Sequence, residues 1–257
     1  MSTIVSIHSY RGGTGKSNLA ANLASSLVQQ GKRVAVVDTD IQSPGLHVLF
    51  GMDPQKMGLT LNDYLYGRCS IEQAAYDVTS KLGPDLPKVG GGALYLIPSS
   101  IKASEITRVL REGYEVNLLT DGFRKLIKAF RLDYLFLDTH PGLNEETLLS
   151  ILISDTLVLI LRPDQQDFQG TAVTVEVARK LKLKNLLLVV NKALPKLDFV
   201  SLRQQVQEAY NAPVAGILPL SEEMIELGSA GIFSLEYPGH PYSQGVREVA
   251  TQISSTA

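Results

Sequence analysis

Short apolar runs, many of them rich in β-branched residues, recur along the chain and alternate with longer stretches in which apolar residues return every three or four positions. A short run of this kind predicts a buried strand, and the longer spacing predicts an amphipathic helix. Because the runs are apolar throughout, both faces of the strands are expected to be covered. We therefore predict an α/β fold, a mostly parallel sheet flanked by helices, with strands at residues 3–7, 33–37, 93–97, 134–138, 156–161, 186–190 and 214–218.

Helical periodicity and local signals place the helices between these strands. The first helix is predicted at residues 18–28, and Gly31 follows it as a closing glycine. Ser70 and Gln73 match a capping box. Glycine and proline predict a turn at residues 90–92 and a loop at 162–167. Further helical patterns lie at residues 46–51, 59–66, 104–111, 116–130 and 144–153, from that loop to 183, near 222, and at 243–253.

The composition fits one large globular domain, predicted to span residues 1–257. Of the 257 residues, 44% are hydrophobic and 19% are charged. The formal net charge of −2 gives no overall attraction to nucleic acid or to an acidic membrane, so such binding would need a local patch. Cys69 is the only cysteine, which excludes an intrachain disulfide framework and fits a cytoplasmic setting. We expect neither a secretory signal nor a membrane-spanning helix.

The turn between the first strand and the first helix carries the clearest chemical signal. Residues 10–17 read YRGGTGKS. Glycines let such a turn curl so that successive backbone N–H groups face one anion, and the start of the next helix adds its own N–H groups. Lys16 would reach the β- and γ-phosphates of a nucleotide, and the Ser17 hydroxyl would hold Mg²⁺. The predicted phosphate-contacting residues are Arg11, Gly12, Gly13, Thr14, Gly15, Lys16, Ser17 and Asn18.

Polar side chains follow three other predicted strands. Asp38 and Asp40 come after the second strand, Asp138 ends the strand at 134–138, and Asn191 follows the strand at 186–190. The carboxyl ends of parallel strands meet at one edge of a sheet, which is where open α/β sheets bind ligands. An acid at this edge can lie beside the metal ion of a bound nucleotide. Two structural alternatives stay open: Asp40 could cap the following turn, and Asn191 could be a turn former.

Residues 11–17 resemble the deviant Walker A motif of the ParA/MinD family, Lys-Gly-Gly-x-Gly-Lys-Ser/Thr, with Arg11 in place of the leading lysine. Residues 38–40 (DTD), 41–46 and 138–142 (DTHPG) resemble further segments of that family, including its two switch regions, so the resemblance covers most of the chain. It implies a doubly wound P-loop NTPase fold. It also implies slow, Mg²⁺-dependent ATP hydrolysis, stimulated by dimerisation and by a partner protein.

The resemblance also implies catalytic roles for individual residues. Lys16, Arg11, Asp40 and Asp138 are the expected catalytic group. Asp40 would position the attacking water. Arg11 would reach across a homodimer to the partner's phosphates, although arginine can also be a solvated charge on the shoulder of the loop.

Metal and base contacts are implied in the same way. Ser17, Asp38 and Asp138 would lie at the Mg²⁺ ion. Asn191 would read the adenine edge, and the backbone of Pro219 and Leu220 would form the other side of the base pocket. The histidines have no metal-ligand spacing and are interpreted as structural, including the one inside the second switch segment; they are His8, His47, His140 and His240.

The family resemblance implies two alternative partner surfaces. Non-specific DNA, the surface of the ParA branch, is the preferred one, and basic residues in the last third of the chain are the candidate contacts. The tail at 246–257 has too small an apolar face to hold a membrane, which argues against a MinD-like membrane-associated regulator. The candidate DNA contacts, which could also be a solvated helix face, are Arg179, Lys180, Lys182, Lys184, Lys196 and Arg203.

Three other classes of protein share this scaffold. A metallochaperone would need paired cysteines, and a ligase related to dethiobiotin synthase would need a substrate motif that is absent. A scaffold that binds ATP but hydrolyses it poorly remains open because of Arg11. The preferred interpretation is an ATP-dependent dimerising switch that positions or segregates a cellular cargo, in the cytoplasm or on the nucleoid.

Overall fold

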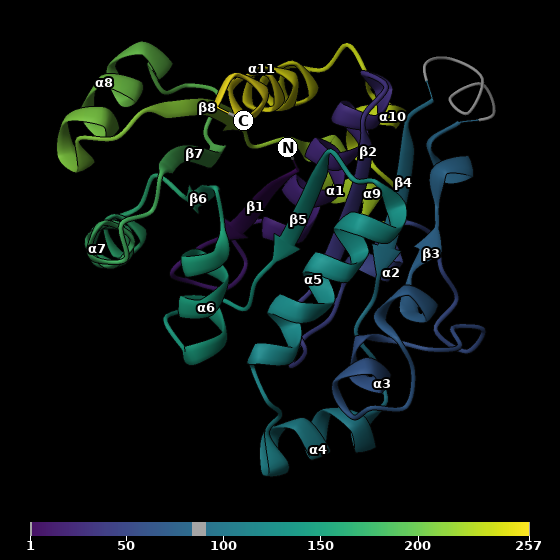
Figure 1. Ribbon diagram of the computed structural model, residues 1–257. Coiled ribbons are helices and arrows are strands. Elements are labelled where there is room, and N and C mark those ends of the chain that lie inside the picture. The colour runs from purple at the N-terminus through teal and green to yellow at the C-terminus, as the bar shows by residue number, and fades with distance from the viewer. Residues whose placement is uncertain (1, 84–90, 257) are drawn as a thin grey trace.

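A computed structural model of the protein describes residues 2–83 and 91–256 (Figure 1). One eight-stranded sheet runs through this part of the chain in the order β3-β4-β2-β5-β1-β6-β7-β8. Neighbouring strands pair in parallel except for β3 and β4, so the predicted parallel sheet is confirmed. The strands are β1 (Thr3–His8), β2 (Arg33–Asp38), β3 (Tyr76–Asp77), β4 (Ala93–Ile97), β5 (Tyr134–Asp138), β6 (Thr156–Leu161), β7 (Asn185–Ala193) and β8 (Val214–Pro219).

Helices cover both faces of the sheet, as Figure 1 shows. Short 3₁₀ turns at Ile71–Ala74 and Thr79–Leu82 connect elements near β3. The helices are α1 (Lys16–Gln29), α2 (Leu46–Leu49), α3 (Leu61–Leu65), α4 (Ala103–Glu112), α5 (Asn117–Phe130), α6 (Glu145–Ile153), α7 (Gln165–Lys180), α8 (Phe199–Tyr210), α9 (Glu222–Leu227), α10 (Phe233–Glu236) and α11 (Pro241–Thr256).

The hydrophobic core divides into layers because successive strand side chains point to opposite faces. On β2, Val34 and Val36 pack toward α1 and α11. Ala35 and Val37 pack toward α3 and α5 on the other face. A third cluster under α6, α7 and α8 buries the outer strands β6, β7 and β8. Every predicted strand therefore contributes to the core, which explains why each is apolar along most of its length.

Several predicted boundaries shift in the structure. The strand predicted at 186–190 continues to Ala193, so that Asn191 and its neighbour Lys192 belong to β7. Helix α7 begins at Gln165 because the Asp164 side chain accepts a hydrogen bond from the Asp167 N–H, so residues 165–167 are helical and not loop. The same helix ends at Lys180, three residues before the predicted end.

Other elements were not predicted. They are helix α8, helix α10 and the two-residue strand β3. The capping box at Ser70 and Gln73 is confirmed, although it opens a 3₁₀ turn and not an α-helix. Of the turn predicted at 90–92, Gly90 lies outside the described residues.

The strand order positions the functional edge. Strand β1 lies between β5 and β6. Strands β2 to β5 lie on one side of β1, and after β5 the chain crosses to the other side, where β6, β7 and β8 follow. The loop after β1 therefore sits where the direction of strand addition reverses. Ligands of open α/β sheets bind outside the carboxyl ends of the strands at such a switch point.

Candidate nucleotide site

The glycine-rich loop joins β1 to α1 in a curled conformation. Gly13 and Gly15 have φ values of 74° and 99°, in the left-handed region. A Cβ atom on Gly15 would lie 2.5 Å from Asn191 Nδ2, so both the backbone conformation and this close contact disfavour a side chain at position 15. Helix α1 starts directly at Lys16 with no side-chain cap and no acidic residue in its first turn. Its first N–H groups are therefore open to an anion.

Two neighbouring side chains at the end of β7 hold the loop from outside. Asn191 Nδ2 donates to the Thr14 carbonyl at 2.8 Å, and Lys192 Nζ donates to the Gly13 carbonyl at 2.8 Å. Lys192 has a φ of 56°, an uncommon backbone conformation for a lysine. Sequence analysis missed Lys192. The available signal was its position beside Asn191 at the same edge of the sheet.

Asp38 and Asp138 lie side by side, because β2 and β5 pair them in register. Both are buried, and among the described residues neither Asp138 oxygen has a hydrogen-bond partner. Burial raises the pKa of Asp138 to about 7, against the opposing effects of the nearby Ser17 hydroxyl and Lys16 ammonium. A buried carboxylate without a partner is costly and fits a cation. Asp138 and Ser17 are thus suited to hold Mg²⁺, which would neutralise phosphate charge when bound.

Asp38 has a different environment from Asp138. Its Oδ1 accepts from the Asp40 N–H at 3.2 Å, and its Oδ2 accepts from the N–H groups of Gly45 and Leu46 at 3.1 and 3.2 Å. Burial, followed by the Asp138 charge, raises the pKa of Asp38. Asp38 therefore organises the backbone of residues 40–46, and its contact with a metal ion stays a prediction.

Lys16 is the ammonium that faces these acids. It is 7% exposed, and burial lowers its pKa, while Asp138 and Asp40 act in the opposite direction. A buried ammonium beside a curled row of amide donors is suited to a triphosphate.

Asp40 lies between the two switch-like loops. Its Oδ1 accepts from the Ser43 N–H at 3.1 Å, so the alternative that Asp40 caps the following turn describes its local bonding. The same oxygen lies 2.7 Å from Nδ1 of His140. Sequence analysis interpreted His140 as structural; the structure places it on the wall of the phosphate cavity beside Asp40.

Two cavities meet at the loop and form one trench. The phosphate end has a volume of about 380 Å³ and the base end about 360 Å³; Gly13, Gly15 and Asn18 line both. The phosphate end also contains Gly12, Lys16, Ser17, Asp40, Ser43, His140 and Pro141. The base end also contains Asn191, Lys192, Pro219, Leu220, Ser221, Met224, Ile225 and Tyr242. The trench thus unites most of the predicted site residues.

Arg11 lies outside this trench lining and is held by the start of α7. Its Nη1 lies 3.5 Å from Asp167 Oδ1 and 3.7 Å from Asp164 Oδ1. Arg162 pairs with the same two acids, at 3.0 and 3.2 Å. The Arg11 side chain is 39% exposed, so these pairs are weak enough to exchange.

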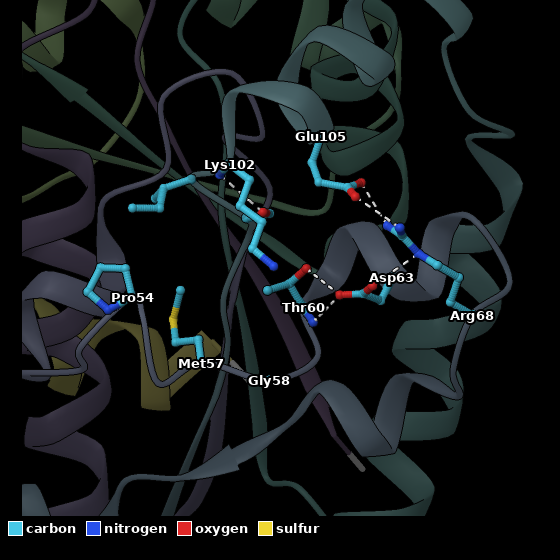
Figure 2. A pocket seen from close by; sticks show the side chains of 10 residues that line it. Pro54, Met57, Gly58, Thr60, Asp63, Arg68, Lys102 and Glu105 are labelled. Atoms are coloured by element: carbon cyan, nitrogen blue, oxygen red, sulfur yellow. Dashed lines mark hydrogen bonds and ion pairs between the residues drawn. The ribbon is translucent and has the colours of Figure 1, made fainter.

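A separate hollow near β4 is much smaller than the trench, and the arginine that lines it is already paired with acids (Figure 2). Its volume is about 100 Å³. The guanidinium group of Arg68, which lines the hollow, is paired with Asp63 at 3.0 Å and with Glu105 at 2.7 Å. The trench at the end of β1 is therefore the candidate nucleotide site.

The predicted DNA contacts are largely used within the protein. Lys180 pairs with Glu176 at 2.7 Å, and Lys184 pairs with Asp155 at 3.1 Å. Arg179 donates to backbone carbonyls of residues 210 and 211, and Arg203 donates to the carbonyl of residue 214. Lys182 and Lys196 are exposed. Four of the six basic residues thus have partners within the protein, and DNA binding stays a prediction.

The structure also bears on the alternatives of a membrane-associated regulator and a metallochaperone. In the chain from 2 to 83 and from 91 to 256, no helix is long and apolar enough to cross a membrane, and no cluster of three histidine, cysteine or acidic residues could hold a metal. Helix α11 uses its apolar face in the core, where Val246, Val249 and Ile253 are fully buried. That face is therefore not available to a membrane surface.

Comparisons with known proteins match this arrangement. The family profile described as AAA domain (AAA_31) matches residues 2–194. An uncharacterized ATP-binding protein of Methanocaldococcus jannaschii is 25% identical over 256 residues, which cover 98% of this chain and 88% of that protein.

Two solved structures share the fold. The septum site-determining protein MinD of Pyrococcus horikoshii, complexed with Mg-ADP, superposes with a TM-score of 0.78 at 20% identity and covers 100% of this chain and 99% of its own. A putative plasmid partition protein of Borrelia burgdorferi bound to AMPPNP gives 0.76 at 18% identity, with 100% of both chains covered.

Proposed function

Because the chain belongs to the AAA domain family AAA_31, among the ParA/MinD P-loop ATPases, we propose that it is an ATP-dependent dimerising switch that hydrolyses ATP with Mg²⁺ to position a cellular cargo. The observation that carries this proposal is the trench. The Lys16 ammonium, an open helix start and the Asp40 carboxylate line one end, with the buried Asp138 carboxylate close to Lys16 behind that lining, and a largely apolar base pocket lies at the other end. No other described cavity combines these chemistries.

Each end of the trench has its own part in this proposal. Lys16 and the loop amides bind the β- and γ-phosphates, and Ser17 and Asp138 hold the metal ion. Asn191 has one amide hydrogen and one oxygen lone pair left after its bonds to Thr14 and Lys192, which is enough to contact the edge of adenine.

Dimerisation supplies the remaining cation. Arg11 of a second copy exchanges its contacts with Asp164 and Asp167 for the phosphates of this copy. A cation supplied in trans is worth on the order of 10³–10⁵ in hydrolysis rate where it acts as an arginine finger. Hydrolysis therefore waits for dimerisation, and an activating partner protein completes the switch.

The positioning role rests on the relatives. The Pyrococcus horikoshii structure is titled a septum site-determining protein, and the Borrelia burgdorferi structure a putative plasmid partition protein. Both titles describe placement of a cellular object. Non-specific DNA is the proposed surface, with Lys182 and Lys196 as the exposed basic residues that remain for it.

Light scattering with hydrolysis measurements tests the proposal. The wild-type chain is expected to release phosphate slowly from MgATP and to dimerise transiently, whereas Asp40→Ala binds ATP and accumulates as a dimer. A matched control is Val173→Ala, an exposed position on α7 outside the trench. ATP binding without any phosphate release or dimer, at any protein concentration, would contradict the switch.

A second candidate function is favoured by one observation. Asp164 and Asp167 hold Arg11 in the free chain. If Arg11 never left these two acids, it could not reach a second copy's phosphates, and the protein would be an ATP-binding scaffold with weak hydrolysis. Asp164→Asn loosens this restraint. A large rise in phosphate release by that variant, from a wild type that is almost inactive even when concentrated, would favour the scaffold.

A further inference from the structure

Asp40 is held by groups from two different loops. Oδ1 of its carboxylate accepts from the Ser43 N–H at 3.1 Å, within the loop that follows β2. The same oxygen lies 2.7 Å from His140 Nδ1, in the loop that follows β5. The carboxylate therefore links the two loops that border the phosphate end of the trench.

The loop that carries His140 is held by the start of α6. The His140 backbone carbonyl accepts from the Thr147 hydroxyl at 3.3 Å, and the Thr147 N–H is capped by the Asn144 side chain at 2.8 Å. The loop that carries the ring is thus attached to the first turn of α6. Because a carboxylate oxygen can only accept, Nδ1 must carry the hydrogen of this bond. The other ring nitrogen, Nε2, is then the unprotonated one in a neutral ring.

This bonding leaves the two oxygens of Asp40 unequal. Oδ1 has two partners, and Oδ2 has none in the part of the chain that the structure describes. The side chains of His140 and Asp40 are only 24% and 14% exposed, so the pair lies in the wall of the cavity and not on the open surface. One carboxylate oxygen is fixed, and the other is left to contact a water molecule.

We infer that His140 is a positioning residue for ATP hydrolysis: by donating from Nδ1 to Asp40 Oδ1, it holds the free oxygen of Asp40 toward the attacking water and joins the two loops around the phosphates. This inference rests on the proposed function, in which Asp40 orients that water. His140 acts through Asp40 and need not touch the substrate. Misplacement of a reacting or orienting group by about 1 Å costs up to about 100-fold in rate, so the contribution is large enough to measure.

Two substitutions separate positioning from direct participation of the ring. His140→Asn places an amide N–H near the position of Nδ1 and has nothing at Nε2. His140→Leu fills a similar volume and donates nowhere. A positioning role predicts that His140→Leu slows single-turnover hydrolysis of MgATP by about 10- to 100-fold, with ATP affinity changed less than about twofold. His140→Asn is expected to restore most of the lost rate.

A double substitution tests whether the two residues act as one unit. If His140 acts only through Asp40, His140→Leu combined with Asp40→Ala is no slower than Asp40→Ala alone. The control is Val173→Ala, an exposed position on α7 that lines neither end of the trench. Its hydrolysis rate is expected to equal that of the wild type.

A spectroscopic measurement tests the bond without nucleotide. The chain has four histidines, so the imidazole ¹⁵N signals of His140 can be assigned by their loss in His140→Leu. For the neutral ring of the wild type we expect the tautomer with hydrogen on Nδ1, and for Asp40→Ala a mixture of the two tautomers. This readout remains informative even if His140→Leu folds poorly.

Each failure has a separate meaning. Equal rates for the wild type and His140→Leu, equal losses for His140→Asn and His140→Leu, or an Nε2–H tautomer in the wild type would each overturn the positioning role and leave the switch intact. A wild type that binds ATP without hydrolysing it, or an Asp40→Ala variant with normal hydrolysis, would overturn the proposed function, and this inference with it.

Discussion

His8 makes the stability of the protein depend on pH in a way that can be calculated. It ends β1 directly beneath the glycine-rich loop and is fully buried. Its Nδ1 lies 2.7 Å from the Thr139 hydroxyl, which itself donates to the Ile7 carbonyl at 2.9 Å, so the ring must donate to Thr139. Its Nε2 has no hydrogen-bond partner among the described residues. Burial, with the charges of Lys16 and His140, lowers the pKa of His8 from 6.5 to about 3.

The size of the effect follows from linkage. Below pH 6.5 the unfolded chain binds a proton at His8 that the folded chain does not bind until about pH 3. The stabilisation by neutral His8 is therefore fully present above pH 6.5 and decreases steadily as the pH falls toward 3. Each pH unit in that window removes about 1.4 kcal/mol of unfolding free energy. Between about pH 7 and pH 5 the loss is about 2 kcal/mol, a large part of the stability of an ordinary domain.

Urea unfolding of the wild type and His8→Asn at these two pH values measures the effect. Asparagine keeps a donor for Thr139 and cannot ionise. The titrating carboxylates, Asp38 and Asp138 included, are common to both proteins and cancel in the comparison. The wild type is expected to lose about 2 kcal/mol more than His8→Asn on acidification. Equal losses in the two proteins would mean that His8 is not held neutral in the folded state, and would refute the reasoning.

Three further predictions concern the trench and its surroundings. Gly15→Ala is expected to cost at least about 1 kcal/mol in stability, because of its left-handed backbone, and to weaken ATP binding by displacing the Asn191 amide; calorimetry that finds normal affinity would contradict the close packing. Lys16→Ala is expected to abolish ATP binding, and an unchanged affinity would rule out the loop as the phosphate site. Arg11→Ala is expected to keep ATP binding but to lose ATP-dependent dimerisation in light scattering, whereas Arg11→Lys keeps the charge and should retain it; a dimer formed equally well by Arg11→Ala would exclude the contact in trans.

The strands could be predicted from the sequence because burial on both faces leaves an unmistakable pattern. Strand β5 is one example: its four apolar residues are followed by Asp138, and the structure places this acid at the expected edge. Helix α8 was missed for the opposite reason. Only Leu202, Val206 and Tyr210 of its twelve residues are buried, and its single basic residue, Arg203, was interpreted as a DNA contact. A helix with so few buried residues has a weak hydrophobic periodicity, so the sequence pattern alone does not reveal it.

In the candidate site, too, features set by a short segment could be predicted from the sequence, whereas contacts between distant segments could not. The curl at Gly13 and Gly15 is a property of a short segment, and the residue types alone predicted it. The bonds that fix the curl join residues 177 and 179 positions apart in the chain, Asn191 to Thr14 and Lys192 to Gly13. No local pattern can show which carbonyl a lysine will reach. The sequence could only place Lys192 at the same edge as the loop.

Lys192 also shows that the loop's geometry depends on more than its glycines. A non-glycine residue with a φ of 56° costs on the order of 1 kcal/mol and persists only where its surroundings maintain it. Lys192 is exposed, so this cost is not offset by burial of its side chain. The compensating interaction is the bond from Lys192 Nζ to the Gly13 carbonyl. By holding that carbonyl on the outside, Lys192 keeps the peptide N–H groups of the loop on the inside, where the phosphates would bind. The affinity of the loop for ATP should therefore depend on β7, a strand that lies two positions from β1 in the sheet and contributes no residue to the glycine-rich motif.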